Sequence, residues 1–166
     1  EKKEENDFEE YKTYKTKALI SETAIFDLVP QFEKIVETEQ PVHIDIVAAR
    51  LAPIIGKTKV TTSVKNLAEK LALIAKNKIK NENGFLCFYT LEDISVRTAG
   101  ERTISQISDK EILKAMQIVE NNSIGIKKEE LIRVTSKCFG FYKITEKMMT
   151  RFEYVYLLLD ESKKQE

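Results

Sequence analysis

The stretch that most constrains the fold of this chain is residues 41–89, where two amphipathic helical patterns stand directly before a hairpin signal. The first pattern has apolar residues at positions that share one face of a helix: Val47, Leu51, Ile54 and Ile55. Gly56 follows, and glycine accepts the positive φ that commonly ends a helix. These features predict a helix that stops before a short turn at Gly56.

A second helix is predicted from Thr61 to Lys76, because the Thr61 hydroxyl can cap its first turn and an apolar stripe follows. Lys78–Lys80 and the apolar run 85–89 then flank Asn81-Glu82-Asn83-Gly84, and Asn-Gly between such segments indicates a β-hairpin. Helix, turn, helix and hairpin in this order predict a winged helix-turn-helix over residues 29–89.

The segments before this stretch carry weaker signals. Residues 1–10 are almost wholly polar and are predicted to be a disordered lead-in. Residues 11–28 start with alternating Tyr, Thr and Lys, which suits an exposed extended segment or an edge strand. Pro30 fits either the first turn of one helix or a break between two short helices. Of these, we favour a helix from about Val29 to Thr38.

The segments after the hairpin return to a helical pattern. Residues 90–107 are predicted to be a connector with short strands near Ile94–Arg97 and Arg102–Ile104. A helix is expected from Ser108 to about Glu120, with Ser108 and Glu111 as a capping box. Residues 161–166 are expected to form a tail.

The second half of the chain repeats the first with a shift of 84 residues. The shift aligns Gly56 with Gly140 and Thr61 with Thr145, within a shared G-x-x-K-[VI]-T-x-x-[VM] pattern. It therefore predicts a second helix-turn-helix copy over residues 108–160. Little sequence remains after its third helix, so the second wing is either cropped or vestigial. The predicted fold class is mainly α with small β elements (α+β), as tandem winged-helix repeats.

Composition limits the environment in which the chain works. No run approaches the roughly 18 uncharged apolar residues of a membrane span, and no signal-peptide pattern opens the chain. Because the sequence begins without Met, we expect it to be a piece of a longer protein. Cys87 and Cys138 stand in apolar runs, which favours buried free thiols in a reducing cytoplasm.

Charge is zero overall but unevenly distributed. Residues 41–89 hold eight basic and three acidic residues, a net charge of +5, whereas residues 1–40 hold six lysines and eleven acids, a net charge of −5. The predicted winged helix is thus the one clearly basic segment, and a nucleic-acid backbone is the partner that such a segment suits.

No catalytic, metal or cofactor site is predicted. Gly56-Lys57-Thr58 lacks the earlier glycine and the preceding strand of a phosphate-binding loop. His43 is the single histidine, so a histidine-based metal cluster is not supported. Adjacent acids such as Glu129-Glu130 fit helix starts better than a buried acid–base pair.

The predicted DNA-contacting residues lie on and beside the second helix and in the wing: Lys57, Lys59, Thr62, Lys65, Asn66, Lys78 and Lys80. Lysines there can neutralise duplex phosphates. Glu69 in the middle of the same face disfavours base reading, so contact with the duplex DNA backbone is expected. The alternative is a solvated surface on a module that docks protein partners.

In the second copy the corresponding face carries apolar and acidic side chains, among them Met149, Glu153 and Leu157. Exposed Met and Leu suit protein contact, whereas acid there is unfavourable for phosphate. We therefore expect this face to bind another domain of the same parent protein or a second copy of the chain, as a homodimer.

Three segments carry a resemblance to a known family: PVHIDIVAARLAPIIGKTKVTTSVKNL, SVR…GERTISQISDKEI and IGIKKEELIRVTSKCFGFYKITEKM. Over about residues 11–155 the chain resembles an uncharacterised C-terminal domain of large bacterial superfamily-one helicase proteins, which commonly carry a very-short-patch-repair-like nuclease domain. The family usually has more arginine in the third helix of each copy, where this chain has lysine, and usually continues into a second wing. The resemblance implies a non-catalytic accessory domain of a restriction or phage-defence protein.

Overall fold

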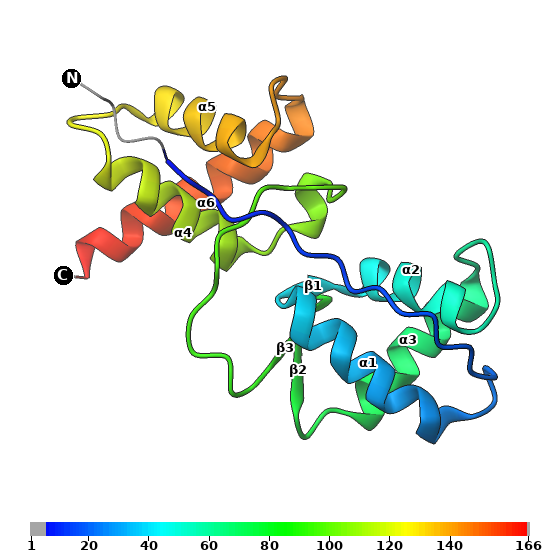
Figure 1. Cartoon of the computed structure of the whole chain (residues 1–166). Coiled ribbons are helices and arrows are strands. Elements are labelled where there is room, and N and C mark those ends of the chain that lie inside the picture. The colour runs from blue at the N-terminus through cyan, green and yellow to red at the C-terminus, as the bar shows by residue number, and fades with distance from the viewer. Residues whose placement is uncertain (1–5, 166) are drawn as a thin grey trace. The chain divides into compact units, whose positions relative to one another are not determined.

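The structure is a computed structural model that describes residues 6–165, and these residues form two compact units. The N-terminal unit consists of Lys12–Asp93, and the C-terminal unit consists of residues 94–165 together with residues 6–11. Helices dominate, and a small sheet lies in the N-terminal unit (Figure 1), which confirms the predicted α+β class. Within the described residues, no helix has both the length and the apolar character needed to cross a bilayer.

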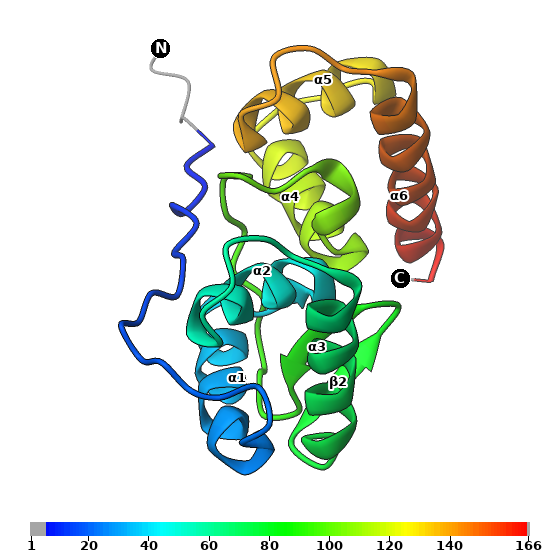
Figure 2. The same cartoon turned by 90° about the vertical axis from the view of Figure 1, so that its right-hand side faces the viewer.

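The N-terminal unit packs three helices around one apolar core: α1 (Ile25–Glu39), α2 (Ile44–Ile54) and α3 (Thr62–Ile74). All three helices contact one another (Figure 2). The predicted cap is confirmed, since the Thr61 hydroxyl accepts a hydrogen bond from the Val64 amide. Gly56 has φ of +77° just past α2, as its place in the pattern predicts.

The sheet of this unit has three antiparallel strands in the order β1-β3-β2, made by Val42–His43, Phe85–Phe88 and Ile79–Glu82. The predicted hairpin is confirmed, and its turn is the two-residue pair Asn83-Gly84, with φ of +55° and +88°. Strand β1 is absent from the sequence prediction, because two residues are too short for a periodic signal.

The predicted start of the first helix is wrong, whereas its predicted end at about Thr38 is within one residue of the observed end. Helix α1 begins at Ile25, four residues before the expected start, and runs without a break past Pro30. Pro30 cannot donate to the Phe26 carbonyl, but Phe26 is exposed, so water can replace that hydrogen bond. The predicted extended segment therefore ends near Ala24, and residues 12–20 have no regular secondary structure.

The C-terminal unit contains three further helices around a separate core: α4 (Asp109–Asn121), α5 (Lys128–Phe139) and α6 (Glu146–Lys164). Each begins 84 residues after its counterpart, since α1, α2 and α3 begin at residues 25, 44 and 62. Gly140 has a positive φ of +102°, as Gly56 has in the first set. Helix α6 continues through most of the predicted tail, and residue 166 lies outside the described residues.

The predicted lead-in is not a free tail where the structure describes it. Residues 1–5 lie outside the described residues, but Phe8 packs on Phe139 with ring centroids 5.1 Å apart. The Glu9 amide donates to the Val96 carbonyl at 3.0 Å, and the Thr98 amide donates to the Glu9 carbonyl at 2.8 Å. Residues 6–11 thus belong to the C-terminal unit.

The connector prediction is also wrong in part. Arg97 forms a single bridge with Glu9, and Ile104–Gln106 forms a 3-10 helix (η1) in place of the expected strand. Ser108 caps α4 as predicted, but the Glu111 carboxylate does not complete a capping box, because it binds arginine side chains. Most of the predicted connector is therefore integral to the C-terminal unit.

Candidate nucleic-acid interface

The start of α3 is a well-defined local structure. Thr61 Oγ1 accepts from the Val64 amide at 3.4 Å and lies 3.0 Å from Ser63 Oγ, while Lys57 Nζ donates to Ser63 Oγ at 3.1 Å. These contacts join the loop after α2 to the first turn of α3. The backbone N–H groups of that first turn add a partial positive charge, which favours an anion nearby.

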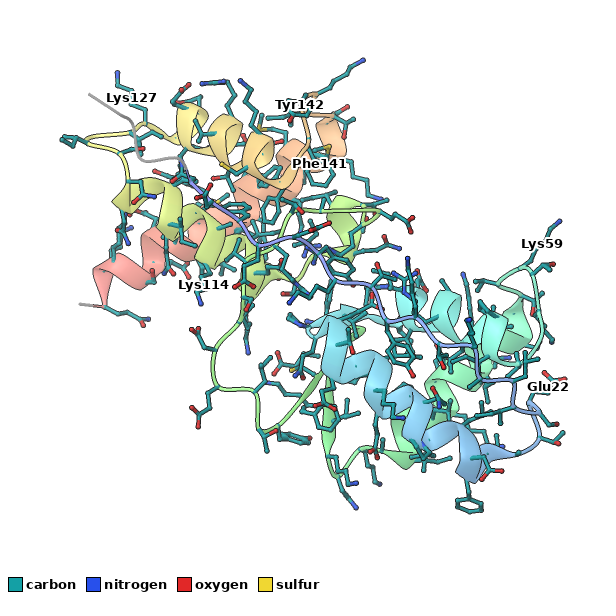
Figure 3. The ribbon with its side chains drawn as sticks, viewed as in Figure 1. Glu22, Lys59, Lys114, Lys127, Phe141 and Tyr142 are labelled. Atoms are coloured by element: carbon teal, nitrogen blue, oxygen red, sulfur yellow. The ribbon has the colours of Figure 1, made fainter. Side chains whose placement is uncertain are left out.

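Two lysines near the start of α3 are exposed to solvent. Lys59 lies on the α2–α3 loop and points away from the protein (Figure 3), and Lys65 lies on the exposed face of α3. Among the described residues, no carboxylate pairs with either side chain. An incoming phosphate would therefore displace no ion pair at these two positions.

Lys57 is already partly neutralised. Its Nζ lies 3.3 Å from Glu22 Oε2 (Glu22 is labelled in Figure 3, at the same end of the unit as Lys59). Both side chains are partly exposed, so solvent screens the pair and its net contribution to stability is small. Glu22 therefore competes with a phosphate for Lys57.

The two predicted wing lysines already form ion pairs within the N-terminal unit. Lys78 Nζ lies 3.5 Å from Glu33 Oε1 on α1, and Lys80 Nζ lies 3.2 Å from Glu82 Oε1 on its own strand. Lys78 follows the C-terminal end of α3, which is about 18 Å from the start of that helix at 1.5 Å per residue. Because of this separation, Lys57, Lys59 and Lys65 form one basic end, and Lys78 lies away from it.

The exposed face of α3 matches the predicted pattern. Thr62, Asn66 and Glu69 are exposed, while the opposite face buries Val64, Leu67, Ala68, Leu71 and Ala72 in the core. Farther along the same helix, Leu73 is 70% exposed. The polar half of the face thus lies beside Lys59 and Lys65, and the apolar part lies at the other end.

The predicted protein-contacting residues of the second copy do not share one environment. Met149 is half-buried against the core of the C-terminal unit, whereas Leu157 is 59% exposed on α6. Glu153 is exposed and lies 3.8 Å from Lys128 Nζ. Met149 therefore packs against the core, whereas Leu157 is the apolar residue of the three that faces solvent.

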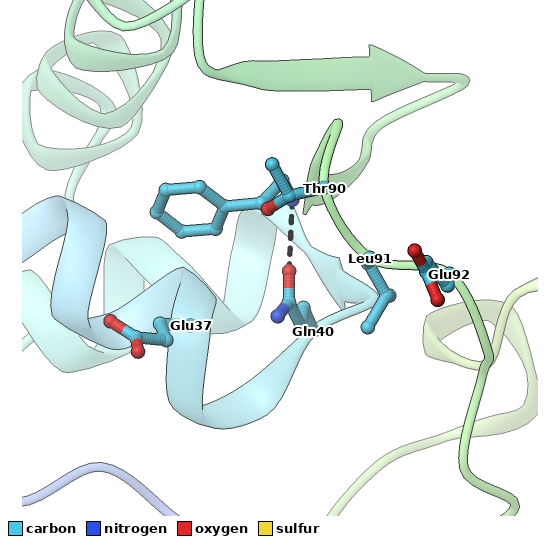
Figure 4. Close-up of a pocket in the computed structure, with 6 residues that line it drawn as sticks. Glu37, Gln40, Thr90, Leu91 and Glu92 are labelled. Carbon is cyan, nitrogen blue, oxygen red and sulfur yellow. Dashed lines mark hydrogen bonds between the residues drawn. The ribbon is translucent and has the colours of Figure 1, made fainter.

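The sequence gives no signal for a pocket between the end of α1 and the residues after β3. It is lined by Glu37, Gln40, Phe88, Thr90, Leu91 and Glu92 (Figure 4). Gln40 Oε1 accepts from the Phe88 amide at 2.8 Å and so ties the two segments together. Because Glu37 and Glu92 both contribute carboxylates, the lining does not suit a phosphate group.

The remaining candidate residues have structural roles in the described part of the chain. His43 caps α2, with Nδ1 accepting from the Asp45 amide at 3.1 Å, and its ring packs edge-on against Phe85. Cys87 is a buried thiol, and burial raises the pKa of the half-buried Cys138 thiol. No group of three His, Cys, Asp or Glu side chains among residues 6–165 is arranged to hold a metal ion.

Comparison of the chain with models of protein families, with curated proteins and with solved structures gives no match.

Proposed function

We propose that the N-terminal unit is a winged helix-turn-helix that contacts the backbone of duplex DNA through the start of α3. Its order of elements, α1-β1-α2-α3-β2-β3, supports the proposal, as does the three-stranded sheet that the hairpin completes. In such folds the third helix enters the major groove while nearby lysines meet phosphates. The equal spacing of helix starts supports a second, wingless copy in the C-terminal unit.

The observation that carries the proposal is the basic end of the unit. Lys59 and Lys65 are exposed beside the N-terminus of α3, and the adjacent polar side chains, Thr62 and Asn66, are exposed with them. Glu69 on the same face disfavours base-specific contact, so the expected binding is sequence-tolerant and salt-sensitive. The role that fits is a non-catalytic accessory domain that positions DNA for a larger helicase-nuclease protein.

The test is fluorescence anisotropy of a labelled duplex against the full chain over a salt series. Lys59→Glu/Lys65→Glu should weaken binding at least tenfold at low salt and reduce the salt slope by about two, because each lysine accounts for about one released counterion. Lys12→Glu/Lys34→Glu is the matched control, since both lysines are exposed and the charge change is equal. No binding at about 10⁻⁴ M protein in low salt would reject the proposal.

An alternative function is docking of a protein partner, and one observation favours it. Leu73 and Leu157 are 70% and 59% exposed, and they occupy equivalent positions on α3 and α6, one 84-residue shift apart. Exposed leucines on a helix face suit contact with another domain or a second copy of the chain. Sedimentation velocity of Leu73→Glu and Leu157→Glu against the unsubstituted chain tests self-association, and a monomer in every case would reject the homodimer.

A further inference from the structure

The loop between α5 and α6 holds one aromatic ring in the core and presents the next to solvent. Phe141 packs near Phe139 and is half-buried, whereas Tyr142 is 82% exposed. Ser136 fixes the backbone of Phe141 on both sides: the Phe141 amide donates to the Ser136 carbonyl at 2.9 Å, and Ser136 Oγ donates to the Phe141 carbonyl at 3.0 Å. The exposed Tyr142 side chain (labelled in Figure 3) therefore follows a residue whose backbone is held by two hydrogen bonds.

Lysines without a carboxylate partner among the described residues lie within five residues of Tyr142 in the sequence. Three exposed lysines lie between residues 137 and 147, namely Lys137, Lys143 and Lys147, and no carboxylate of the described residues pairs with them. By contrast, four other cations of the C-terminal unit lie in ion pairs: Lys128, Arg133, Arg151 and Lys163. The one acid in this stretch, Glu146, lies in the first turn of α6, where the helix dipole offsets its charge.

An exposed aromatic ring among free lysines matches the chemistry of single-stranded nucleic acid. Unpaired bases stack on aromatic side chains whatever their sequence, and neighbouring cations meet the phosphates. A duplex would not offer its base faces to Tyr142, because they are stacked on each other. We propose that this loop binds single-stranded nucleic acid, with Tyr142 stacked on a base and the lysines at its phosphates. The proposal does not depend on duplex binding by the N-terminal unit.

The absence of tryptophan from the chain allows a direct test. Tyr142→Trp introduces a single tryptophan at the proposed stacking position of the full chain, and its emission can be excited apart from that of the tyrosines. Titration with oligodeoxythymidine should quench its emission in a saturable way, and the midpoint should rise steeply with salt. Tyr154→Trp is the matched control, because Tyr154 is 52% exposed on α6 outside the loop, and its emission should not change.

Substitutions then separate stacking from charge. Tyr142→Ala should weaken binding of labelled oligodeoxythymidine about tenfold, and Tyr142→Phe should restore it, since both rings stack. A parallel series with oligouridine shows whether the sugar matters. Lys12→Glu/Lys34→Glu, an equal charge change outside both proposed binding surfaces, should leave the quenching unchanged. Because the emission reports on position 142 alone, this test is separate from that of the N-terminal unit. Equal affinity of Tyr142→Ala and the unsubstituted chain, or no quenching by either oligonucleotide in low salt, would overturn the proposal.

Discussion

Arg102 donates two parallel hydrogen bonds to the Glu111 carboxylate, from Nη1 to Oε1 at 2.9 Å and from Nη2 to Oε2 at 3.0 Å. Arg97 adds three more, from Nη2 to Oε1 at 2.6 Å and from its backbone amide and Nε to Oε2 at 3.1 and 3.4 Å. The Tyr11 ring packs on both guanidinium groups, with its centroid 4.4 Å from the Arg102 carbon and 4.8 Å from the Arg97 carbon. All three charged groups are buried. Glu111 thus links the start of α4 to the segment before it and to residues 6–11.

Glu111→Gln should strongly destabilise the C-terminal unit. The amide keeps the volume of the side chain but leaves two buried guanidinium groups without a counter-charge, which costs about 3–5 kcal/mol in comparable buried pairs. Amide hydrogen exchange resolved by residue is the suitable measurement, because two units need not unfold together. Glu130→Gln, which removes an exposed pair with Arg133, is the control and should change nothing measurable. If the amides of α4 kept their protection from exchange in Glu111→Gln, the Glu111 carboxylate would not be needed for the stability of the C-terminal unit.

The same cluster predicts the direction of acid sensitivity. Burial by itself raises the pKa of Glu111, but the hydrogen bonds and charges of Arg102 and Arg97 outweigh it, so the pKa is lower than its ordinary value of 4.5. A carboxyl whose pKa falls on folding stabilises the protein above about pH 4.5, and that stability is lost as the pH falls through the folded value.

Exchange protection in α4, α5 and α6 should therefore decline below about pH 4.5, and Glu111→Gln should lack this part of the slope. An identical pH dependence in the two proteins would show that other groups control acid unfolding.

Phe8→Ala should loosen the C-terminal unit. The ring is half-buried and packs edge-on against Phe139, so its loss should cost about 1–2 kcal/mol in burial and ring contact. The amides of Glu9 and Thr98, which bond across the bridge, should exchange faster, while amides in α2 should keep their protection. Unchanged exchange at Glu9 and Thr98 would show that Phe8 does not hold this segment.

Glu22→Gln should strengthen duplex binding. It releases Lys57 from its ion pair at 3.3 Å, which makes a third lysine available at the start of α3. The affinity in low salt should rise about threefold, and the salt slope should increase by up to about one. Glu33→Gln, which releases Lys78, makes the same charge change and serves as the control. An equal gain in both variants would mean that net charge, and not the basic end, governs binding.

Elements whose signals are local could be predicted from the amino-acid sequence. Thr61 and Ser108 cap helices as predicted, and Asn83-Gly84 forms the hairpin turn, because a cap or a turn depends on side chains within a few residues of each other. The stripe that predicts α3 is likewise periodic, so its buried and exposed faces could be assigned in advance.

The ion pairs, and the grouping of distant segments into one unit, could be seen only in the folded chain. Glu39 is buried and accepts from Arg50 and from the Tyr14 amide, and Glu111 binds Arg97 and Arg102, yet no spacing in the sequence marks these partners. Whether a lysine meets a carboxylate depends on chain segments far apart in sequence, as Lys57 with Glu22 and Lys78 with Glu33 show. Local patterns cannot encode such pairs, because they form only when packing brings distant segments within a few ångströms.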